Sequence, residues 1–200
     1  SSIDVHYMRL INEIQLLGTN SDDRTGVGTV SMFGAMLETD LSNNALPAIS
    51  VRKVAPRWAF EELMFMLNGK SQTKELEEKG INIWKGNTTR EFLDARGLSH
   101  VAEGDFGPMY GVQLREFFAV SDSRGTSDQL RYMHNEIINN PTSRRIIATH
   151  YNPSEVHLGA LFPCHIMTQF NVRDGKLDCL FWMRSSDVGF GLPYNLMYYG

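Results

Sequence analysis

Hydrophobic residues recur at the spacing of an α-helix in three parts of the chain. Residues 7–17 repeat apolar positions every three or four residues and are followed by a glycine, which is a common helix end. A second helix should begin near Pro56, and because residues 58–67 are apolar almost all round, we expect it to be buried. A third periodic segment covers residues 130–138 and ends before Pro141. These patterns predict three helices spread along the chain.

Alternation of apolar and polar residues predicts strands between the helices. Residues 30–40 alternate loosely, residues 144–152 form a second strand-like run, and residues 165–185 predict a hairpin. The Asp174-Gly175 pair at the centre of the hairpin favours a tight turn. Because helices and strands do not alternate regularly, we expect an α+β fold with a mostly mixed sheet backed by helices.

The composition fits one globular domain over residues 1–200, since 42% of the 200 residues are hydrophobic and 21% are charged. A net charge of -4 gives no general attraction to nucleic acid or to an anionic membrane. The sequence has neither the roughly 20 apolar residues of a membrane span nor the apolar part of a signal peptide, so we expect a cytoplasmic location. No His/Cys cluster has zinc spacing, so no metal is expected.

Cys164 lies between a proline and a histidine in LFPCHIMTQF, residues 161–170. A cysteine considered alone is more often an inert core residue than a nucleophile. His165 is the next residue on the predicted strand, so it points to the opposite face and is a poor base for Cys164, which argues against a cysteine hydrolase. A nearby guanidinium would favour the thiolate and so make Cys164 a nucleophile.

Glu62 and Glu61 are neighbours in the second predicted helix but differ in their surroundings. Glu62 has apolar residues three and four positions away on both sides, whereas Glu61 has Arg57 one turn earlier as a partner. Glu62 is therefore the candidate for a buried carboxyl, and burial would raise its pKa so that it transfers protons near neutral pH. A partly exposed helix glutamate is the alternative.

Arginines beside predicted turns and strand ends can bind an anion through paired hydrogen bonds. Four have this setting: Arg24, Arg144, Arg145 and Arg184. Two of these are adjacent on a predicted strand, so only one of them would face a given site. Solvated surface charge is the alternative for each. Residues 184–195 are polar and turn-rich, as in many sites, although Asn195 could equally cap a helix.

Seven segments together resemble the thymidylate synthase family in their order and spacing. They span nearly the whole chain: DRTGVGT, FEELMFML, NIWKGNTTREFLD, GDFGPMYG, NPTSRRII, LFPCH and RSSDVGFGLPYN. The resemblance implies an α+β homodimer with a large twisted sheet at the dimer interface. It also implies that Cys164 attacks C6 of the pyrimidine of dUMP, after which C5 takes up the one-carbon unit of the co-substrate 5,10-methylenetetrahydrofolate.

The resemblance implies roles for the residues that match the family's motifs. Catalytic roles would fall to Cys164, Glu62, Arg184, Tyr110 and His165. The phosphate would be bound by Arg24, Arg184 and Ser185, with Arg144 and Arg145 reaching over from the partner subunit. Substrate binding would also involve Asp187 and Asn195, whose amide matches O4 and N3–H of uracil and so favours dUMP over dCMP. The folate ring system would lie among Ile83, Trp84, Leu161, Asp187, Gly191 and Tyr194.

The chain departs from the family's pattern at positions that bear on the product. Met183 stands where the family has glutamine before the RS pair, and Leu114 stands where the family has the tryptophan of its QWR motif. Tyr151 stands in place of the tryptophan of the family's WNP motif, and Phe162 in place of the proline that precedes PCH. A methionine before RS is typical of the related phage pyrimidine hydroxymethylases, in which water adds to the exocyclic methylene intermediate. The chain also ends before the family's C-terminal segment, so we expect it to be a portion or to complete the site differently.

These departures favour a dUMP hydroxymethylase, with 5-hydroxymethyl-dUMP as its product. A thymidylate synthase, with dTMP and dihydrofolate as products, is the alternative within the same chemistry. A catalytically silent nucleotide-binding relative is the alternative from another class, although Cys164, Glu62 and Asn195 argue against it.

Overall fold

A computed structural model describes residues 2–22, 26–117 and 127–199. The chain divides into two compact units. The first comprises Ser1–Ala59 and Asp187–Gly200, and the second comprises Phe60–Ser186. The single catalytic domain expected over residues 1–200 stays a prediction.

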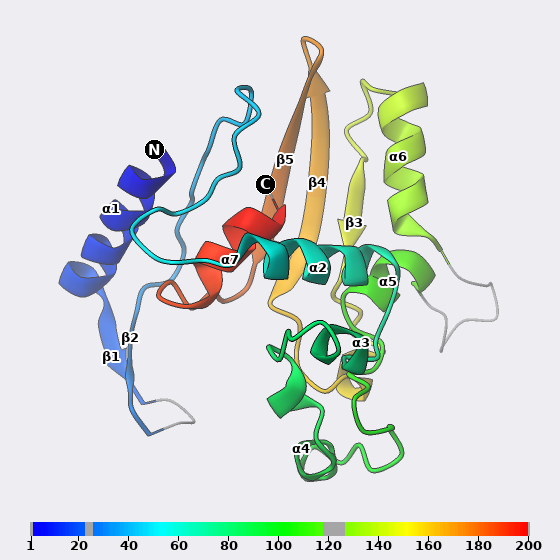
Figure 1. Cartoon of the computed structure of the whole chain (residues 1–200). Helices are drawn as coiled ribbons and strands as arrows, with labels where there is room; N and C mark the ends of the chain where they lie inside the picture. The colour runs from blue at the N-terminus through cyan, green and yellow to red at the C-terminus, as the bar shows by residue number, and fades with distance from the viewer. Residues whose placement is uncertain (1, 23–25, 118–126, 200) are drawn as a thin grey trace. The chain divides into compact units, whose positions relative to one another are not determined.

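The first unit combines two helices with a short two-stranded ribbon (Figure 1). Its elements are α1 (Ser2–Leu17), β1 (Thr19–Ser21), β2 (Thr29–Ser31) and α7 (Gly191–Tyr199). One face of α1 packs with α7 in a hydrophobic cluster of Ile3, Tyr7, Leu10, Ile49 and Leu192. The Tyr7 hydroxyl also donates to the Val188 carbonyl at 2.9 Å, which joins the N-terminal helix to the turn before α7.

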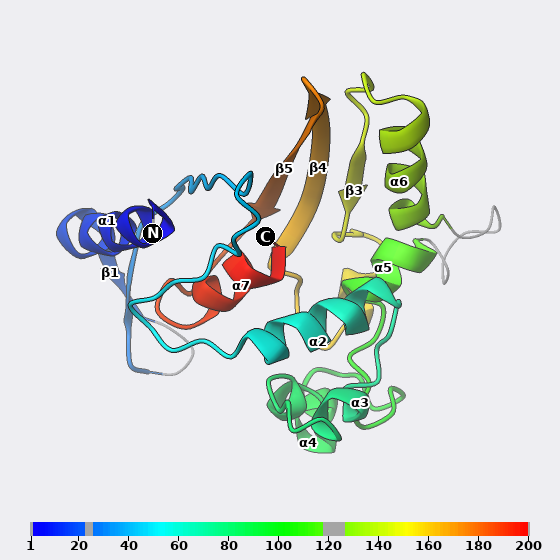
Figure 2. The same cartoon turned by 45° about the horizontal axis from the view of Figure 1, so that its top comes forward.

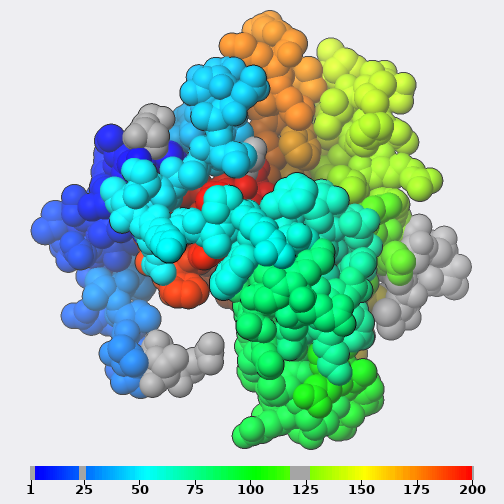
Figure 3. Space-filling view, viewed as in Figure 1, coloured from blue at the N-terminus to red at the C-terminus, as the bar shows by residue number. Residues whose placement is uncertain are grey.

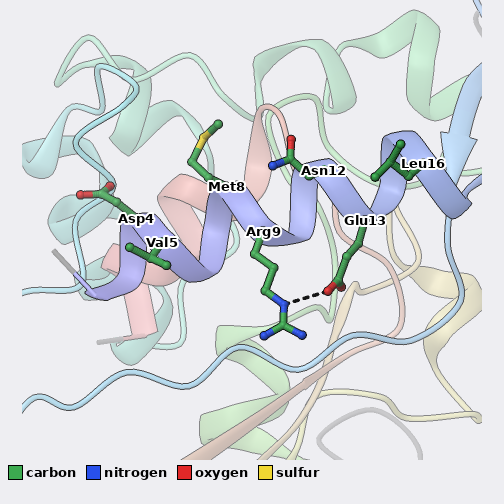
Figure 4. Close-up of a pocket in the computed structure, with 7 residues that line it drawn as sticks. All are labelled: Asp4, Val5, Met8, Arg9, Asn12, Glu13 and Leu16. Carbon is green, nitrogen blue, oxygen red and sulfur yellow. Dashed lines mark hydrogen bonds and ion pairs between the residues drawn. The ribbon is translucent and has the colours of Figure 1, made fainter.

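The other face of α1 carries a shallow hollow (Figure 4). It is lined by Asp4, Val5, Met8, Arg9, Asn12, Glu13 and Leu16. Arg9 Nε and Glu13 Oε1 lie 2.9 Å apart across it, and both side chains are exposed to solvent. None of the residues with a predicted catalytic or binding role lines this hollow.

The sequence patterns of the first unit are confirmed in part. The helix predicted for residues 7–17 is confirmed and begins earlier, at Ser2. The strand predicted for residues 30–40 is wrong beyond Ser31, because only Thr29–Ser31 forms a strand, paired antiparallel with Thr19–Ser21. Gly34 has a φ of 83°, which lies outside the β region and prevents an extended run from continuing.

The second unit contains the larger sheet and the remaining helices. Its helices are α2 (Pro56–Leu67, which begins in the first unit), α3 (Lys74–Glu77), α4 (Arg90–Ala95), α5 (Gly111–Glu116) and α6 (Gln129–Asn139), with short 3-10 turns η1 (Lys85–Asn87) and η2 (Val156–Leu158). Its strands are β3 (Ile147–Thr149), β4 (His165–Arg173) and β5 (Lys176–Met183). In the space-filling view the green segment around α3 and α4 forms one continuous block of atoms (Figure 3).

Strands β3, β4 and β5 form an antiparallel sheet in that order, and α6 lies beside β3 (Figure 2). The predicted hairpin is confirmed: Asp174 and Gly175 have φ values of 50° and 71°, and two positive φ values are what a type I′ turn requires. The α+β class is confirmed. A mixed sheet was expected, but all described strands pair antiparallel. The turn of Asp174 and Gly175 between β4 and β5 is short enough to join only antiparallel neighbours.

Helix α6 and the sheet share a hydrophobic core. Its buried members are Leu114, Met133, Ile146 and Ala148. The helix predicted for residues 130–138 is therefore confirmed, with its apolar face toward the sheet. Leu114, one of the departures from the family's pattern, is accounted for by packing in this core.

Helix α2 is confirmed as a helix that begins at Pro56, but it is not buried all round. Phe65 and Met66 are buried, whereas Phe60 is 60% exposed. A helix at the edge of a core turns only one side toward it, so an apolar sequence alone does not guarantee burial on every face.

Candidate active site

Cys164 is a free, half-buried cysteine immediately before β4. Its backbone N–H donates to the Tyr110 hydroxyl at 3.1 Å. Its carbonyl accepts from the backbone N–H of Arg184 at 2.9 Å, which extends the pairing of β4 and β5 by one residue. The main chain on both sides of the sulfur is therefore held by hydrogen bonds.

The Arg184 guanidinium lies beside the Cys164 sulfur, with Nη2 3.6 Å from Sγ. Nε donates to the Pro163 carbonyl at 2.9 Å, and Nη2 donates to the Phe162 carbonyl at 3.0 Å. The cation that would favour a Cys164 thiolate is thus present. A guanidinium N–H at this position can donate a hydrogen bond to an anionic sulfur and so stabilise it.

Tyr110 reaches Cys164 from the residue before α5. Its φ of 40° is unusual for a residue other than glycine. The next residue, Gly111, packs so closely on α2 that a Cβ there would lie 2.4 Å from the Met66 carbonyl oxygen. Burial raises the pKa of Tyr110 well above its usual value, so the hydroxyl keeps its proton and accepts the Cys164 N–H through its oxygen.

Glu62 lies on α2 and accepts a hydrogen bond from Trp84, whose Nε1 is 2.9 Å from Oε1. Burial raises the pKa of Glu62 to about 7, and the hydrogen bond from Trp84 offsets only part of that effect. The raised pKa predicted from the helix pattern is confirmed, and the catalytic role stays a prediction. Glu61, for which the sequence suggested Arg57 as partner, forms an ion pair with Lys79 at 2.5 Å.

The Trp84 ring connects the surroundings of Glu62 to those of Cys164. Its centroid lies 5.8 Å from that of Tyr110, whose hydroxyl contacts the Cys164 backbone. Because the indole also donates to Glu62, one aromatic side chain contacts both predicted catalytic groups, the carboxyl and the tyrosine.

His165 is buried and stacks on His150, with ring centroids 4.2 Å apart. His150 Nδ1 lies 3.3 Å from the Tyr110 carbonyl oxygen, and His165 Nε2 lies 2.9 Å from Thr168 Oγ1. Burial lowers the pKa of His150 to about 4, and burial together with the nearby His150 lowers the pKa of His165 to about 3. Both rings are therefore neutral at pH 7.

A β-bulge lies at the start of β4, directly after Cys164. His165 pairs with Met183 and Met167 pairs with Trp182, so the register shifts by one residue between them. Bulges of this kind bend a strand, redirect side chains and are common beside active sites. Met183 consequently lies across from His165, while Arg184 lies across from Cys164.

The other predicted anion-binding residues are exposed or lie outside the described chain. Arg144 and Arg145 precede β3, so the argument that they face opposite sides of a strand is wrong. The Arg145 N–H donates to the Ser143 hydroxyl at 3.2 Å, a local bond that competes with strand pairing. Ser185 is exposed. Arg24 lies outside the described residues.

Among the described residues, four with a predicted role belong to the first unit: Asp187, Gly191, Tyr194 and Asn195. Asp187 organises the turn that leads into α7, because its Oδ1 accepts from the Phe190 N–H at 2.8 Å and its carbonyl accepts from the Gly191 N–H at 2.9 Å. Asn195 lies inside α7, so the alternative that it caps a helix is wrong. These residues share one helix and the turn before it.

The remaining predicted folate-binding residues lie in the second unit. Ile83 is 40% exposed beside Trp84 in the sequence, and the Leu161 N–H lies 3.4 Å from Met109 Sδ. An indole ring with an exposed aliphatic neighbour, next to the Glu62 carboxyl, offers the kind of surface on which a flat heteroaromatic ring binds. The residues present therefore fit a pterin.

Sequence reasoning missed His150. The signal was its place in the alternating segment 144–152. Ile146 and Ala148 are 0% and 1% exposed, and His150, two residues further, is 8% exposed on the same buried face. A histidine at such a position needs polar partners, and the Tyr110 carbonyl supplies one.

No group of three or more His, Cys, Asp or Glu side chains in the described part of the chain is arranged to hold a metal ion. Of the helices described, none combines the length and the apolar character needed to cross a membrane.

Comparisons with known proteins agree with the α+β fold. A family profile described as thymidylate synthase matches residues 5–200. The chain is 44% identical over 199 residues to bifunctional dihydrofolate reductase-thymidylate synthase 2 of Arabidopsis thaliana, covering 96% of this chain and 35% of that protein. It is 42% identical over 202 residues to the thymidylate synthase of Human herpesvirus 8 type P (isolate GK18), covering 98% and 60%. It is 41% identical over 199 residues to thymidylate synthase 1/2 of Encephalitozoon cuniculi (strain GB-M1), covering 96% and 67%.

The α+β fold and the cysteine site define a class of proteins with a thiol at a strand end beside a guanidinium. Within it, the chain belongs to the thymidylate synthase family. The chain spans 35% and 60% of the length of the first two relatives.

Proposed function

We propose that the protein is a thymidylate synthase, which converts dUMP and 5,10-methylenetetrahydrofolate to dTMP and dihydrofolate. The observation that carries this proposal is the arrangement at Cys164, whose sulfur lies 3.6 Å from Arg184 Nη2 and whose N–H donates to the Tyr110 hydroxyl. The names of the relatives support the synthase, which was our alternative, over the hydroxymethylase that the sequence departures favoured.

In the proposed reaction the Cys164 thiolate bonds to C6 of the uracil ring. The electron pair of the C5–C6 double bond then moves to C5, which bonds to the methylene carbon of the co-substrate. The C5 proton is lost and the bond between the methylene carbon and the folate nitrogen breaks, which leaves an exocyclic methylene group on C5 and releases tetrahydrofolate. Hydride from tetrahydrofolate then reduces the methylene to a methyl group, dihydrofolate forms, and the Cys164–C6 bond breaks as the C5–C6 double bond is restored. Arg184 Nη2 is positioned to donate to the sulfur while it is anionic. The Tyr110 hydroxyl, by holding the Cys164 N–H, keeps the nucleophile in place before and after the bond forms.

Glu62 is the proposed proton carrier. Because burial raises its pKa to about 7, this carboxyl both gives and accepts a proton near neutral pH. The Trp84 N–H holds one carboxyl oxygen at 2.9 Å, which leaves the other oxygen to act on water at O4 of the pyrimidine and on the folate.

We assign the phosphate of dUMP to Arg24, Arg184 and Ser185. Arg144 and Arg145 would come from the partner subunit of a homodimer, and their exposed positions before β3 suit side chains that reach another chain. The Asn195 amide would donate a hydrogen bond to O4 of uracil and accept one from N3–H.

We assign the folate ring system to Ile83, Trp84, Leu161, Asp187, Gly191 and Tyr194. The Trp84 ring and the exposed Ile83 side chain support this assignment in the second unit. The Asp187 turn supports it in the first unit, where its hydrogen bonds fix the start of α7 and so the residues that follow.

Product analysis tests the proposal. The protein is incubated with dUMP and methylenetetrahydrofolate, and the expected products are dTMP and dihydrofolate. Formation of 5-hydroxymethyl-dUMP and tetrahydrofolate would instead establish the hydroxymethylase. A Cys164→Ala variant should lose turnover, whereas Cys179→Ala, which changes the exposed cysteine on β5, should keep it. Full turnover by Cys164→Ala would exclude the covalent route.

A further inference from the structure

The Phe162 side chain contacts both the Tyr151 ring and the Arg184 guanidinium. Its ring centroid lies 5.2 Å from that of Tyr151, with an interplanar angle of 36°. In the cation–π contact, the Arg184 Cζ lies 5.1 Å from the Phe162 ring centroid. Tyr151 and Phe162 are also two of the positions at which the sequence departs from the pattern that the resemblance implies.

The groups that hold the Arg184 guanidinium are all uncharged. They are the carbonyls of Phe162 and Pro163 and the face of the Phe162 ring. Among the described residues, no carboxylate lies within ion-pair distance of Arg184, in contrast to Arg115, which Asp128 binds at 3.0 Å. An acidic partner would cancel much of the charge, whereas carbonyl dipoles and a π face attract the cation and leave its charge intact.

We propose that Phe162, supported by Tyr151, is a positioning residue that holds the Arg184 guanidinium against the Cys164 sulfur without neutralising it. The main-chain hydrogen bonds fix Nε and Nη2, and the guanidinium carbon lies over the Phe162 ring, so Nη2 stays 3.6 Å from Sγ. Phe162 therefore acts through Arg184 and need not touch the substrate. The inference rests on the proposed role of Cys164 as nucleophile and names a residue that prepares it.

The test measures the reactivity of Cys164 in the absence of dUMP and folate. In a Cys179→Ser background, which removes the exposed second cysteine, Cys164 is alkylated with iodoacetate and with iodoacetamide over a range of pH. The ratio of the two rate constants reports the positive charge at the sulfur, because only iodoacetate is an anion. Phe162→Leu should lower this ratio about three- to tenfold, as expected for losing one cation–π contact.

Matched variants separate positioning from simple packing. Phe162→Trp keeps an aromatic face and should retain the ratio, while Phe33→Leu makes the same change at a fully exposed phenylalanine and should leave it unaltered. Thermal unfolding verifies that each variant is folded, and Phe162→Met takes the place of Phe162→Leu if the latter is not. An unchanged ratio in the folded Leu or Met variant overturns the proposal, as does an equal loss in the Trp variant.

This measurement also separates the inference from the proposed function. Alkylation needs no turnover, so a protein that failed to make dTMP could still show the predicted ratios. Conversely, if the protein made dTMP but the ratio of the two alkylation rate constants did not depend on Phe162, the proposed function would stand and the positioning role of Phe162 would be excluded.

Discussion

The imidazole rings of His150 and His165 stack with their centroids 4.2 Å apart, and both are buried in their neutral forms. Burial lowers the pKa of His150 to about 4 and that of His165 to about 3. One ring contacts the Tyr110 carbonyl and the other directly follows Cys164 in the chain. The pair thus links the backbone of the proposed nucleophile to that of its tyrosine partner.

We expect this pair to make the fold sensitive to acid. The folded-state pKa values lie below the ordinary histidine value of 6.5, so between pH 6.5 and about 4 the unfolded chain binds protons that the folded chain does not. Stability should therefore fall as the pH falls through this window, by up to about 1.4 kcal/mol per pH unit for each histidine. Urea unfolding at a series of pH values measures this slope.

A His150→Gln variant should reduce that slope, because glutamine keeps a donor for the Tyr110 carbonyl but does not titrate. His157→Gln, at an exposed position in η2, serves as the control and should leave the slope unchanged. Equal slopes for the wild type and His150→Gln would show that the buried pair does not titrate as the structure predicts.

Glu62 should give the opposite pH dependence. Its folded-state pKa of about 7 lies above the ordinary glutamate pKa of 4.5, so between these two pH values the folded chain holds a proton that the unfolded chain has lost. The contribution of Glu62 to stability should therefore fall as the pH rises from 4.5 to 7. Glu62→Gln should be more stable than the wild type at pH 8, on the order of 1 to 3 kcal/mol, and should lose about 10²- to 10⁴-fold in kcat.

The neighbouring Glu61→Gln variant is the matched control for Glu62→Gln. It removes an ion pair with the half-exposed Lys79 side chain, so we expect its stability to change by less than about 1 kcal/mol. Urea unfolding at pH 5 and pH 8 compares the two variants. The assignment of Glu62 would be contradicted if both variants behaved alike in stability and in kcat.

The hydrogen bond from the Cys164 N–H to the Tyr110 hydroxyl predicts a specific defect in Tyr110→Phe. Removing the oxygen leaves a partly buried N–H without its acceptor, which should cost about 1 to 3 kcal/mol of stability. Hydrogen–deuterium exchange should speed up at the Cys164 amide. Tyr132→Phe, which removes the hydroxyl that donates to the Arg145 carbonyl at an exposed position, should leave exchange at Cys164 as it is.

The close approach of α5 to α2 predicts that Gly111 cannot be replaced. A Cβ at Gly111 would lie 2.4 Å from the Met66 carbonyl oxygen, and backbone cannot move aside as a flexible side chain can. Gly111→Ala should therefore destabilise the protein by about 3 kcal/mol and disturb Tyr110, which precedes it. Gly86→Ala is the control, since nothing lies within 4 Å of its added Cβ, and thermal unfolding compares the two. Equal melting temperatures would refute the close approach.

Much of the local structure could be predicted from the sequence. The helical spacing of apolar residues predicts α1, α2 and α6, and the Asp174-Gly175 pair predicts the turn between β4 and β5. These features depend on residues close together in the chain, whose periodicity and turn preferences act without the rest of the fold. The loose alternation of residues 30–40 is also a local feature, and it predicted a strand that does not form beyond Ser31. Alternation alone does not supply the partner strand that a β-strand needs.

By itself the sequence also determined which chemical groups are available: a thiol at Cys164, a carboxyl at Glu62 and a guanidinium at Arg184. Only the tertiary structure decided how they act together. Arg184 reaches the sulfur from a residue 20 positions away, and the Trp84 indole reaches Glu62 from 22 positions away. The buried surroundings of His150 and the ring stack at Phe162 arise from strands and loops that meet only in the folded chain. Contacts and pKa shifts of this kind depend on packing and on exclusion of water, which residue order does not contain.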